Sequence, residues 1–282
     1  MDGSHYEPAL RRVLWELRAY LDDVVVIGGW VPYLYRRYGG FAGWQGRTSL
    51  TVEVDVLVDR PLPPGARPSI PDILRGCGFR PSGSVGGAAV WMGDVDAGEM
   101  IEFLVPHTGT ARQQGDAVPV AAQAGLRAIS LPGLELMRRY RRPVRIPVAT
   151  EGGETLLDVH VPWLGAYVVN KACTFCRRSA HGEGGGKRSK DLLYLRDVAA
   201  AGEEVMARLE QDLREMARDR RAAGEIGSAG NNLRLAVNGG YPGEVNEAVA
   251  ALRERDATPS EAAALAEFRG RLADLLDLLP VR

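Results

Sequence analysis

The sequence predicts an α+β protein, in which a mixed β-sheet domain is followed by a helical domain. Short apolar runs rich in valine and isoleucine recur up to about residue 161, and turns rich in glycine or proline separate them. From about residue 166 onward, apolar residues recur instead at helical spacing. These observations place a boundary near residue 162, which gives a sheet domain over residues 1–162 and a helical domain over residues 163–282.

The composition is that of an ordinary soluble globular protein. The 282 residues can bury a full core, and hydrophobic and charged residues make up 45% and 25% of the chain. The net charge of -1 gives no overall attraction to nucleic acid, so any such contact needs a local basic patch. The sequence shows no apolar run of transmembrane length, and its N-terminal residues show neither the basic region nor the apolar region that is typical of a signal peptide. We therefore expect a cytoplasmic protein with no membrane partner.

The N-terminal region is predicted to form a helix, a strand and a second helix. Apolar residues recur at helical spacing over Tyr6–Leu21, and Val24–Ile27 is typical of a short buried strand. That strand ends at the pair Gly28 and Gly29, where a helix through about Arg37 begins. Glycine lets a ligand approach the backbone, and the N–H groups at a helix start favour phosphate.

The next strand is predicted to carry two carboxylates on one face. It follows a glycine- and aromatic-rich loop over Tyr38–Gly46, and over Thr51–Val58 apolar residues alternate with Glu53 and Asp55. Residues i and i+2 of a strand face the same side. Two like charges in close proximity repel each other, so such a pair usually has a cation beside it. Carboxylates for a metal near N–H groups for phosphate predict a site for a metal–nucleotide complex.

A third candidate carboxylate lies on a later hairpin. Ala88–Met92 and Met100–Val105 are predicted strands, and Glu102 lies among apolar neighbours on the second. Its carboxylate is suited to completing a metal site or to drawing the proton from an attacking hydroxyl. The alternative is a solvated residue on an alternating strand. We favour Glu102 over Glu99, because the position of Glu99 at the strand start predicts exposure.

A dense run of arginines precedes two more predicted strands, Val144–Val148 and Leu156–Val161. Arg138–Arg142 together with Arg145 place five arginines in eight residues. Such a run is either a solvated face or a contact for the phosphates of RNA or of a triphosphate, with Tyr140 able to stack on a base. The residues alone leave both interpretations open.

The first two predicted helices of the second half are Ala166–Arg178 and the helix opened by Lys187–Leu195. Judged alone, Lys171 is an exposed helix lysine, and Asp191 is a helix-start carboxylate that follows Ser189 as N-cap. The first helix also holds a C-x-x-C pair with the spacing of half a zinc site. Because it lies within a helix and lacks a second pair, we predict buried thiols and no structural zinc.

The C-terminal region is predicted to be helical and charged. One helix is expected over Glu203–Arg221 and another over Glu244–Arg255, with a looser stretch over Ile226–Gly243 between them. The last helix is predicted to begin with Thr258 as N-cap, Pro259 at the first helical position and Glu261 three residues after the cap. Its apolar stripe needs a partner face.

The order of these elements resembles the nucleotidyltransferase superfamily, whose best-known fold is the palm-like domain of DNA polymerase beta. Gly28-Gly29-Trp30 stands for the family's glycine element, Glu53-Val54-Asp55 for its carboxylate pair, and Thr51 for the threonine two residues before that pair. The resemblance implies Mg²⁺ as cofactor, held by Glu53, Asp55 and Glu102. It also implies nucleotide contacts from Gly28, Gly29, Trp30 and Thr51. Glu53 departs from the usual first aspartate by one methylene group.

Residues 6–200 further resemble the AbiEii-type toxins and their MenT relatives. In that family one helix carries Lys-x-x-Ala and an arginine, and a Lys-Asp pair begins the next helix. Lys171 matches the lysine that contacts the nucleotide phosphates, Asp191 matches the aspartate needed in the site, and Lys190 precedes it. Arg178 or its neighbour Arg177 matches the arginine. The catalytic residues implied by the whole resemblance are Glu53, Asp55, Glu102, Lys171 and Asp191.

The acceptor is the part of the reaction on which the sequence is least informative. The resemblance implies an enzyme that transfers a nucleoside monophosphate from an NTP to the 3′ end of tRNA, as the toxin of a toxin–antitoxin system with a cognate antitoxin protein as partner. A tryptophan after Gly-Gly also occurs in antibiotic nucleotidyltransferases, so a hydroxylated drug is an alternative acceptor, and a protein hydroxyl is a third. Glu53 and the lack of a serine after Gly29 leave a further alternative, an inactive nucleotide- or partner-binding protein on the same fold.

Overall fold

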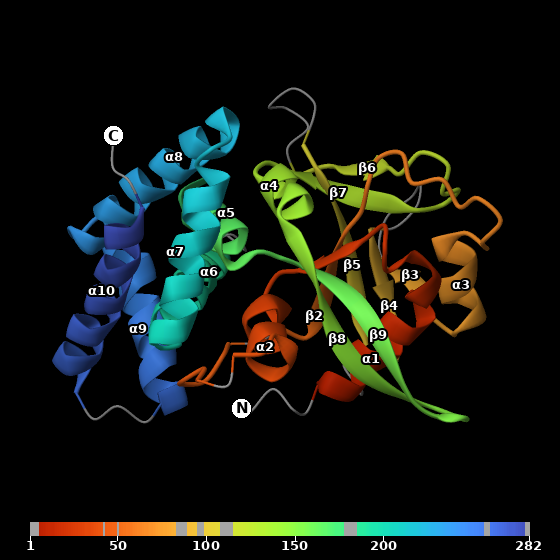
Figure 1. Cartoon of the computed structure of the whole chain (residues 1–282), viewed down its shortest axis with the longest axis horizontal. Helices are drawn as coiled ribbons and strands as arrows, with labels where there is room; N and C mark the ends of the chain where they lie inside the picture. The colour runs from red at the N-terminus through yellow and green to blue at the C-terminus, as the bar shows by residue number, and fades with distance from the viewer. Residues whose placement is uncertain are drawn as a thin grey trace. The chain divides into compact units, whose positions relative to one another are not determined.

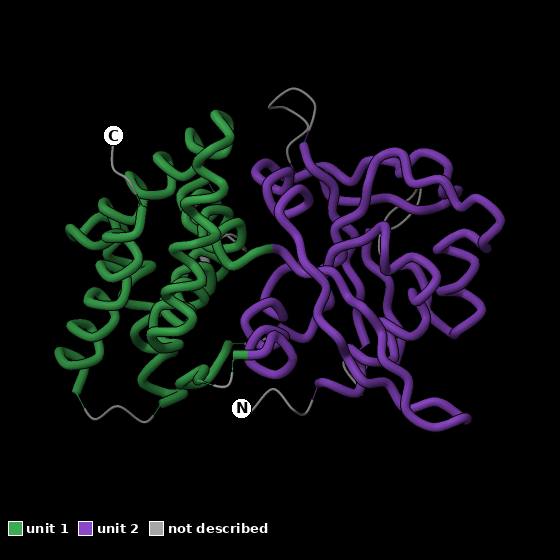
Figure 2. The backbone as a smooth tube through the Cα atoms, viewed as in Figure 1, with its two compact units in different colours: residues 1, 41–49, 163–282 green, residues 2–40, 50–162 purple. Residues whose placement is uncertain are grey.

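The structure is a computed structural model that describes residues 6–41, 43–49, 51–82, 89–94, 99–107, 115–177, 185–256 and 260–279 (Figure 1). The chain forms two compact units, shown in different colours in Figure 2. Unit 2 contains the N-terminal part through Gly40 and then Leu50–Pro162, and unit 1 contains Phe41–Ser49 and Trp163–Arg282. The predicted α+β fold is confirmed. The predicted domain bounds stay a prediction, and the compact units differ from them in placing Phe41–Ser49 with the helices.

Unit 2 is built mainly from β-strands. Its strands are β1 (Val25–Ile27), β2 (Glu53–Leu57), β3 (Arg80–Ser82), β4 (Val90–Met92), β5 (Met100–Pro106), β6 (Ala117–Pro119), β7 (Arg127–Leu131), β8 (Arg141–Thr150) and β9 (Gly153–Pro162). Its helices are α1 (Glu7–Glu16), the 3-10 helix η2 (Arg18–Tyr20), α2 (Trp30–Tyr38), α3 (Ile70–Gly76) and α4 (Leu134–Arg139). The helix predicted over Tyr6–Leu21 is therefore divided, and the short elements β3, β6, β7 and α4 were not predicted.

Seven strands form one mixed sheet in which β2 lies between β1 and β5. β1 pairs with β2 in antiparallel orientation, whereas β2 and β5 run parallel. The other edge of β5 pairs with β4 near its start and with β7 near its end. β8 and β9 form a separate two-stranded hairpin, which confirms the strand pair predicted there. The apolar side chains of β1 are buried, as the valine-rich run predicts.

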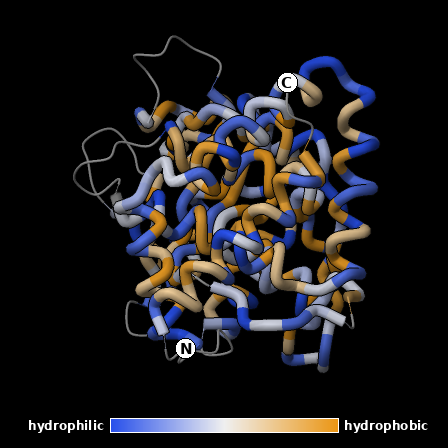
Figure 3. The backbone as a smooth tube through the Cα atoms, turned by 90° about the vertical axis from the view of Figure 1, so that its left-hand side faces the viewer, coloured by the Kyte–Doolittle hydropathy of each residue, from blue (hydrophilic) through white to orange (hydrophobic). Residues whose placement is uncertain are grey.

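Unit 1 consists of helices: α5 (Leu164–Arg177), α6 (Gly185–Ala199), α7 (Glu203–Met216), α8 (Arg220–Val237), α9 (Pro242–Asp256) and α10 (Glu261–Leu278). α5 packs against α6, α7 and α8, and α10 packs against α6, α8 and α9. Hydrophobic and hydrophilic residues alternate along the helices in Figure 3, as expected for helices with one buried face. Among the described residues, no helix combines the length and apolar character needed to cross a membrane.

A buried carboxylate attaches the segment before β2 to the helices of unit 1. Asp197 on α6 accepts hydrogen bonds from the backbone N–H and the hydroxyl of Ser49, both at 2.8 Å. Its Oδ2 also lies 2.8 Å from Nη1 of Arg255 on α9. The Asp197 side chain is fully buried, so these donors replace the water that a carboxylate otherwise requires.

Four predictions about the helices of unit 1 are wrong. The single helix predicted over Glu203–Arg221 ends at Met216, and α8 begins after Asp219, whose carboxylate accepts from the N–H groups of residues 221 and 222. The stretch predicted to be loose is therefore helical through Val237, because burial against α5 outweighs the low helix propensity of its glycines. Ser189 lies inside α6 and is not its N-cap. Ser260, and not Thr258, caps α10; Thr258 and Pro259 lie outside the described residues.

Candidate active site

The side chain of Asp55 occupies the space over Gly28. Gly28 adopts a left-handed backbone conformation with φ of +72°, which lets the chain turn from β1 into α2. A Cβ atom placed on Gly28 would come within 1.8 Å of Oδ2 of Asp55. Only a glycine therefore fits between the end of β1 and the carboxylate of β2. The predicted glycine element and the predicted carboxylate strand are in contact.

The parallel pairing of β2 and β5 places Asp55 directly beside Glu102. Residues in register on neighbouring strands point to the same face of the sheet, and the strands lie about 4.8 Å apart. Glu53 is two residues before Asp55 on the same strand and shares its face. All three carboxylate residues are partly exposed. Within the described parts of the chain, however, no three His, Cys, Asp or Glu side chains come together as a metal-binding group.

The donor set at Asp55 and Glu102 nevertheless fits Mg²⁺. Carboxylate oxygens are the hard ligands that this ion prefers, and Mg²⁺ is usually held by one or two protein carboxylates together with substrate phosphates. Because residue 28 is a glycine, no side chain of its own separates its backbone from the carboxylate of Asp55. A site with two protein carboxylates, to be completed by a triphosphate, is consistent with this geometry, and Glu53 as a third ligand stays a prediction.

Trp30 and Thr51 contact the backbone of β2. The indole Nε1 of Trp30 donates to the carbonyl oxygen of Glu53 at 3.1 Å, and the hydroxyl of Thr51 donates to the same oxygen at 3.2 Å. Trp30 is completely buried. The expected nucleotide contact of the Trp30 side chain does not fit this burial, because the indole already packs inside unit 2.

Glu99, the competing candidate, is not exposed, so the reason given for setting it aside is wrong. Its side chain is buried, with both carboxylate oxygens 2.6–2.7 Å from Nη1 of Arg12 on α1. It also accepts from the backbone N–H of Asp94 at 2.9 Å. Glu99 therefore connects α1 to the β4–β5 hairpin, and these contacts account for the carboxylate without a catalytic role.

In unit 1, Lys171 and Asp191 form a buried ion pair. Nζ of Lys171 on α5 lies 2.7 Å from Oδ1 of Asp191 on α6, and the two side chains are only 9% and 2% exposed. The ammonium also lies 4.9 Å from the centroid of the Tyr194 ring and 5.8 Å from that of Tyr167. Judged alone, Lys171 was expected to be an exposed helix lysine and Asp191 a helix-start carboxylate. The burial of both side chains contradicts the expected exposure of Lys171. The two residues that the resemblance selects are thus in direct contact.

The remaining basic candidates of unit 1 lie around the connection between α5 and α6. Lys190 is exposed on α6, and Arg177 is exposed at the end of α5. Arg178 lies outside the described residues. Arg188, which the sequence did not single out, is buried and pairs with Glu244 at 2.6 Å. Its position next to the predicted Lys-Asp pair was the only sequence signal for it.

The arginine run extends from the end of α4 into β8, and several of its members are engaged within unit 2. Arg138 lies 2.6 Å from Asp59 and 3.0 Å from Glu135, and Arg145 lies 3.3 Å from Asp158. Arg141 donates to the backbone carbonyl of residue 22. Because carboxylates neutralise part of this run, it is a weaker candidate for RNA binding than the sequence suggests.

The sequence also missed a buried polar cluster that joins α1 to α2. The carboxylate of Glu7 accepts hydrogen bonds from Tyr33, Tyr38 and Arg11. Burial alone would raise the pKa of Glu7, but these donors outweigh it and the pKa lies below its ordinary value. No motif signals the cluster, because its members are distributed over 32 positions of the chain.

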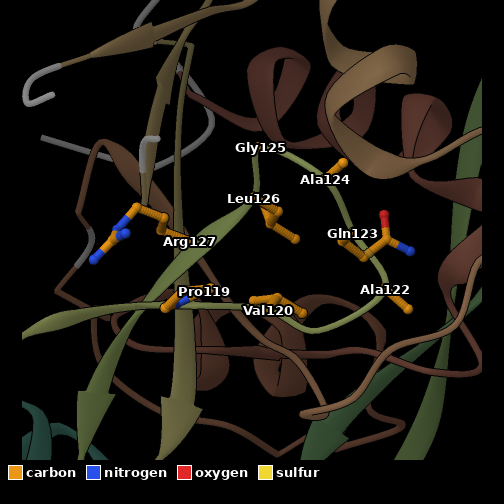
Figure 4. A pocket seen from close by; sticks show the side chains of 8 residues that line it. All are labelled: Pro119, Val120, Ala122, Gln123, Ala124, Gly125, Leu126 and Arg127. Atoms are coloured by element: carbon orange, nitrogen blue, oxygen red, sulfur yellow. The ribbon is translucent and has the colours of Figure 1, made fainter. Parts of the chain in front are cut away.

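A hollow of about 340 Å³ lies at the connection between β6 and β7. Figure 4 shows that its lining comes from one continuous stretch, residues 119–127. Gln123 in this stretch donates to the hydroxyl of Tyr20 and the carbonyl of Leu62, and accepts from the N–H of Ile70. The side chain therefore stabilises the surrounding loops. None of the predicted site residues lines this hollow.

Comparison with protein families gives one match that covers most of these elements. A family model described as nucleotidyltransferase matches residues 9–219. Comparison with curated proteins and with solved structures returned no significant match. The matched span contains β1, β2, β5, α5 and α6, and hence all the predicted site residues. Because the match extends over much more than half of the sequence, the chain belongs to this nucleotidyltransferase family.

Proposed function

We propose that the chain transfers a nucleoside monophosphate from an NTP to a hydroxyl acceptor in a Mg²⁺-dependent reaction, with release of pyrophosphate. Family membership supports nucleoside monophosphate transfer as the reaction class, and nucleotidyltransferases generally use divalent metals. The observation that carries the proposal is the placement of Asp55 over Gly28 with Glu102 in register beside it. Two carboxylates that could hold a cation thus lie next to the backbone of a glycine, Gly28, which has no side chain to block a ligand.

Asp55 and Glu102 would hold Mg²⁺, with Glu53 within reach on the same face. Bound there, the ion would neutralise charge on the triphosphate and polarise the reacting phosphoryl group. Gly28 and Gly29 would present backbone N–H groups near the start of α2 to the phosphates. If Asp55 is the only residue of β2 that binds the metal, the longer side chain of Glu53 does not prevent nucleotide transfer.

Lys171 is proposed to contact the nucleotide phosphates, as the resemblance implies. Its ammonium is oriented by Asp191 and by the Tyr194 ring. A buried ammonium held in this way is preorganised, so it can stabilise charge that develops on a phosphate without reorganising solvent. Asp191 would then act by orienting Lys171.

The 3′ end of tRNA is the acceptor that we propose, with a cognate antitoxin as protein partner. Support comes from the resemblance of residues 6–200 to the AbiEii and MenT toxins. Lys190 and Arg177 are exposed on α6 and α5, the helices that carry Asp191 and Lys171, and are better candidates to meet RNA phosphates than Arg138, which already pairs with Asp59. The alternative acceptors, a protein hydroxyl or a hydroxylated drug, become outcomes of the test.

The test is incubation of the purified chain with Mg²⁺, total tRNA and each of the four α-labelled NTPs in turn. We expect label on tRNA with the wild type and loss of at least a hundredfold in Asp55→Asn. Asp72→Asn, a change to an exposed carboxylate on α3, is the matched control and should transfer at the wild-type rate. Equal activity of Asp55→Asn and wild type would contradict the assignment. Label on protein and none on tRNA would replace the acceptor but keep the reaction class.

A further inference from the structure

The carbonyl oxygen of Glu53 receives two side-chain hydrogen bonds at the start of the carboxylate strand. The indole N–H of Trp30 comes from the first turn of α2, and the hydroxyl of Thr51 comes from the residues just before β2. Their distances to the oxygen, 3.1 and 3.2 Å, are those of ordinary hydrogen bonds. Two different segments thus hold one backbone atom of the strand that carries Glu53 and Asp55.

The course of β1 explains why this position needs side-chain donors. The last residue of β1 that pairs with β2 is Ile27, which lies opposite Asp55. At Gly28 the chain turns into α2, so Glu53 lies beyond the end of the β1–β2 ladder. On its other edge Glu53 still pairs with Met100 of β5, so only the edge of β2 that faces β1 has no strand partner at this position. A backbone polar group on that edge needs a hydrogen-bond partner from elsewhere. The Trp30 indole extends the contact of this segment with β2 by one more residue pair.

The indole itself is held in place from the other side. Trp30 is completely buried, and the ring of Tyr33 packs edge-on against it at 5.5 Å with an interplanar angle of 88°. The hydroxyl of Tyr33 in turn donates to the buried carboxylate of Glu7 on α1. A chain of contacts therefore runs from α1 through Tyr33 and Trp30 to Glu53. Such an indole is a rigid donor.

We propose that Trp30 and Thr51 are positioning residues, which hold the start of β2 so that Asp55 points its carboxylate at the metal, with the Glu53 side chain on the same face. The proposal rests on the proposed function, because it takes Asp55 as a metal ligand. It assigns Trp30 a role through Glu53 and no contact with the nucleotide. Residues that orient metal ligands typically contribute 10–100-fold to metal affinity, and a displacement of about 1 Å can cost 100-fold in rate.

The experiment compares Trp30→Phe, Thr51→Val and the double variant with the wild type. Phenylalanine keeps a buried aromatic ring but has no N–H group, and valine keeps the shape of threonine but has no hydroxyl. Trp91→Phe is the matched control, because Trp91 is equally buried and its Nε1 has no hydrogen-bond partner in the described part of the chain. Thr51→Ser, which keeps a hydroxyl, is the conservative rescue.

Three quantities are measured: hydrogen exchange of the peptide that covers residues 51–57, Mn²⁺ affinity by electron paramagnetic resonance, and kcat and KM as a function of Mg²⁺. In the double variant we expect at least tenfold faster exchange, about tenfold weaker Mn²⁺ binding, and a higher Mg²⁺ concentration for half-maximal rate. Single variants should show smaller effects, because one donor remains. Thr51→Ser and Trp91→Phe should resemble the wild type in exchange and in Mn²⁺ affinity.

A lower melting temperature in the double variant, with unchanged exchange of residues 51–57 and unchanged Mn²⁺ affinity, would overturn the proposal. Equal effects of Trp30→Phe and Trp91→Phe would overturn it as well, because the indole N–H would then be irrelevant. If the wild type neither binds Mn²⁺ nor transfers nucleotide, the proposed function fails. Hydrogen exchange still decides in that case whether Trp30 and Thr51 hold β2.

Discussion

Replacement of Gly28 by alanine should abolish activity at a modest cost in stability. The residue has φ of +72°, a conformation that costs an L-residue with a side chain about 1–2 kcal/mol. In addition, the new methyl group would lie 1.8 Å from Oδ2 of Asp55, whereas ordinary contacts begin at 3.4 Å. The carboxylate must therefore move by more than 1 Å. A displacement of about 1 Å in a catalytic group can lower the rate 100-fold, so we expect at least that loss.

Gly65→Ala separates the backbone effect from the effect on Asp55. Gly65 has a similar φ of +62°, and a Cβ atom there meets no other atom within 4 Å. The Gly65→Ala variant should lose the same amount, about 1–2 kcal/mol, of its free energy of unfolding, which corresponds to a decrease of a few degrees in melting temperature. It should keep its activity. The assay is transfer from a labelled NTP, with thermal unfolding measured on the same samples. If Gly28→Ala retains activity within about threefold of Gly65→Ala, the placement of Asp55 over Gly28 does not matter to catalysis.

Three other predictions follow from buried groups. Replacing either Lys171 or Asp191 alone breaks the buried ion pair and should cost about 3–5 kcal/mol in urea unfolding. Lys171→Met with Asp191→Leu should regain most of that stability without activity, and single variants as stable as the wild type would contradict this. Because the pKa of Glu7 lies below its ordinary value of 4.5, its stabilising effect is present above that pH and is lost as the pH falls through the folded pKa, so the melting temperature of Glu7→Gln should vary less with pH below 4.5 than that of the wild type. Cys173 is buried, and burial raises the pKa of its thiol to about 11, so iodoacetamide at about pH 8 should alkylate it only after unfolding. Rapid labelling of Cys173 in the folded chain would refute this.

The strands near the candidate site could be predicted because their apolar residues alternate or form short runs. Val25–Ile27 and Glu53–Leu57 are as the pattern predicts. Arg80–Ser82 could not be predicted in this way, since its three residues are exposed and include a proline. Most of α8 was missed because it precedes the glycine-rich stretch Gly239–Gly243, although its packing against α5 holds it helical through Val237.

Contacts between distant residues are the part of the site that the sequence could not provide. The side-chain period predicts that Glu53 and Asp55 share a face, but the register that puts Glu102 beside Asp55 depends on the pairing of two parallel strands. In the same way, helical spacing placed Lys171 and Asp191 on two helices, and only the packing of α5 on α6 shows that their charged atoms are 2.7 Å apart. In the arginine run, the sequence suggested free cations. The structure pairs Arg138 with Asp59 and Arg145 with Asp158, and neither carboxylate lies within the run itself.

The register of β2 and β5 also bears on the glutamate at position 53. Residues two apart on a strand are separated by about 6.6 Å along it, whereas residues in register on neighbouring strands are about 4.8 Å apart. Asp55 therefore has Glu102 as its nearer carboxylate neighbour, and Glu53 is the more distant of the two. Asp55 is also the residue over Gly28, and the backbone of Glu53 is the one held by Trp30 and Thr51. In the proposed site Asp55 would therefore be the central ligand and Glu102 its partner, and the extra methylene of Glu53 would lie on the more distant carboxylate.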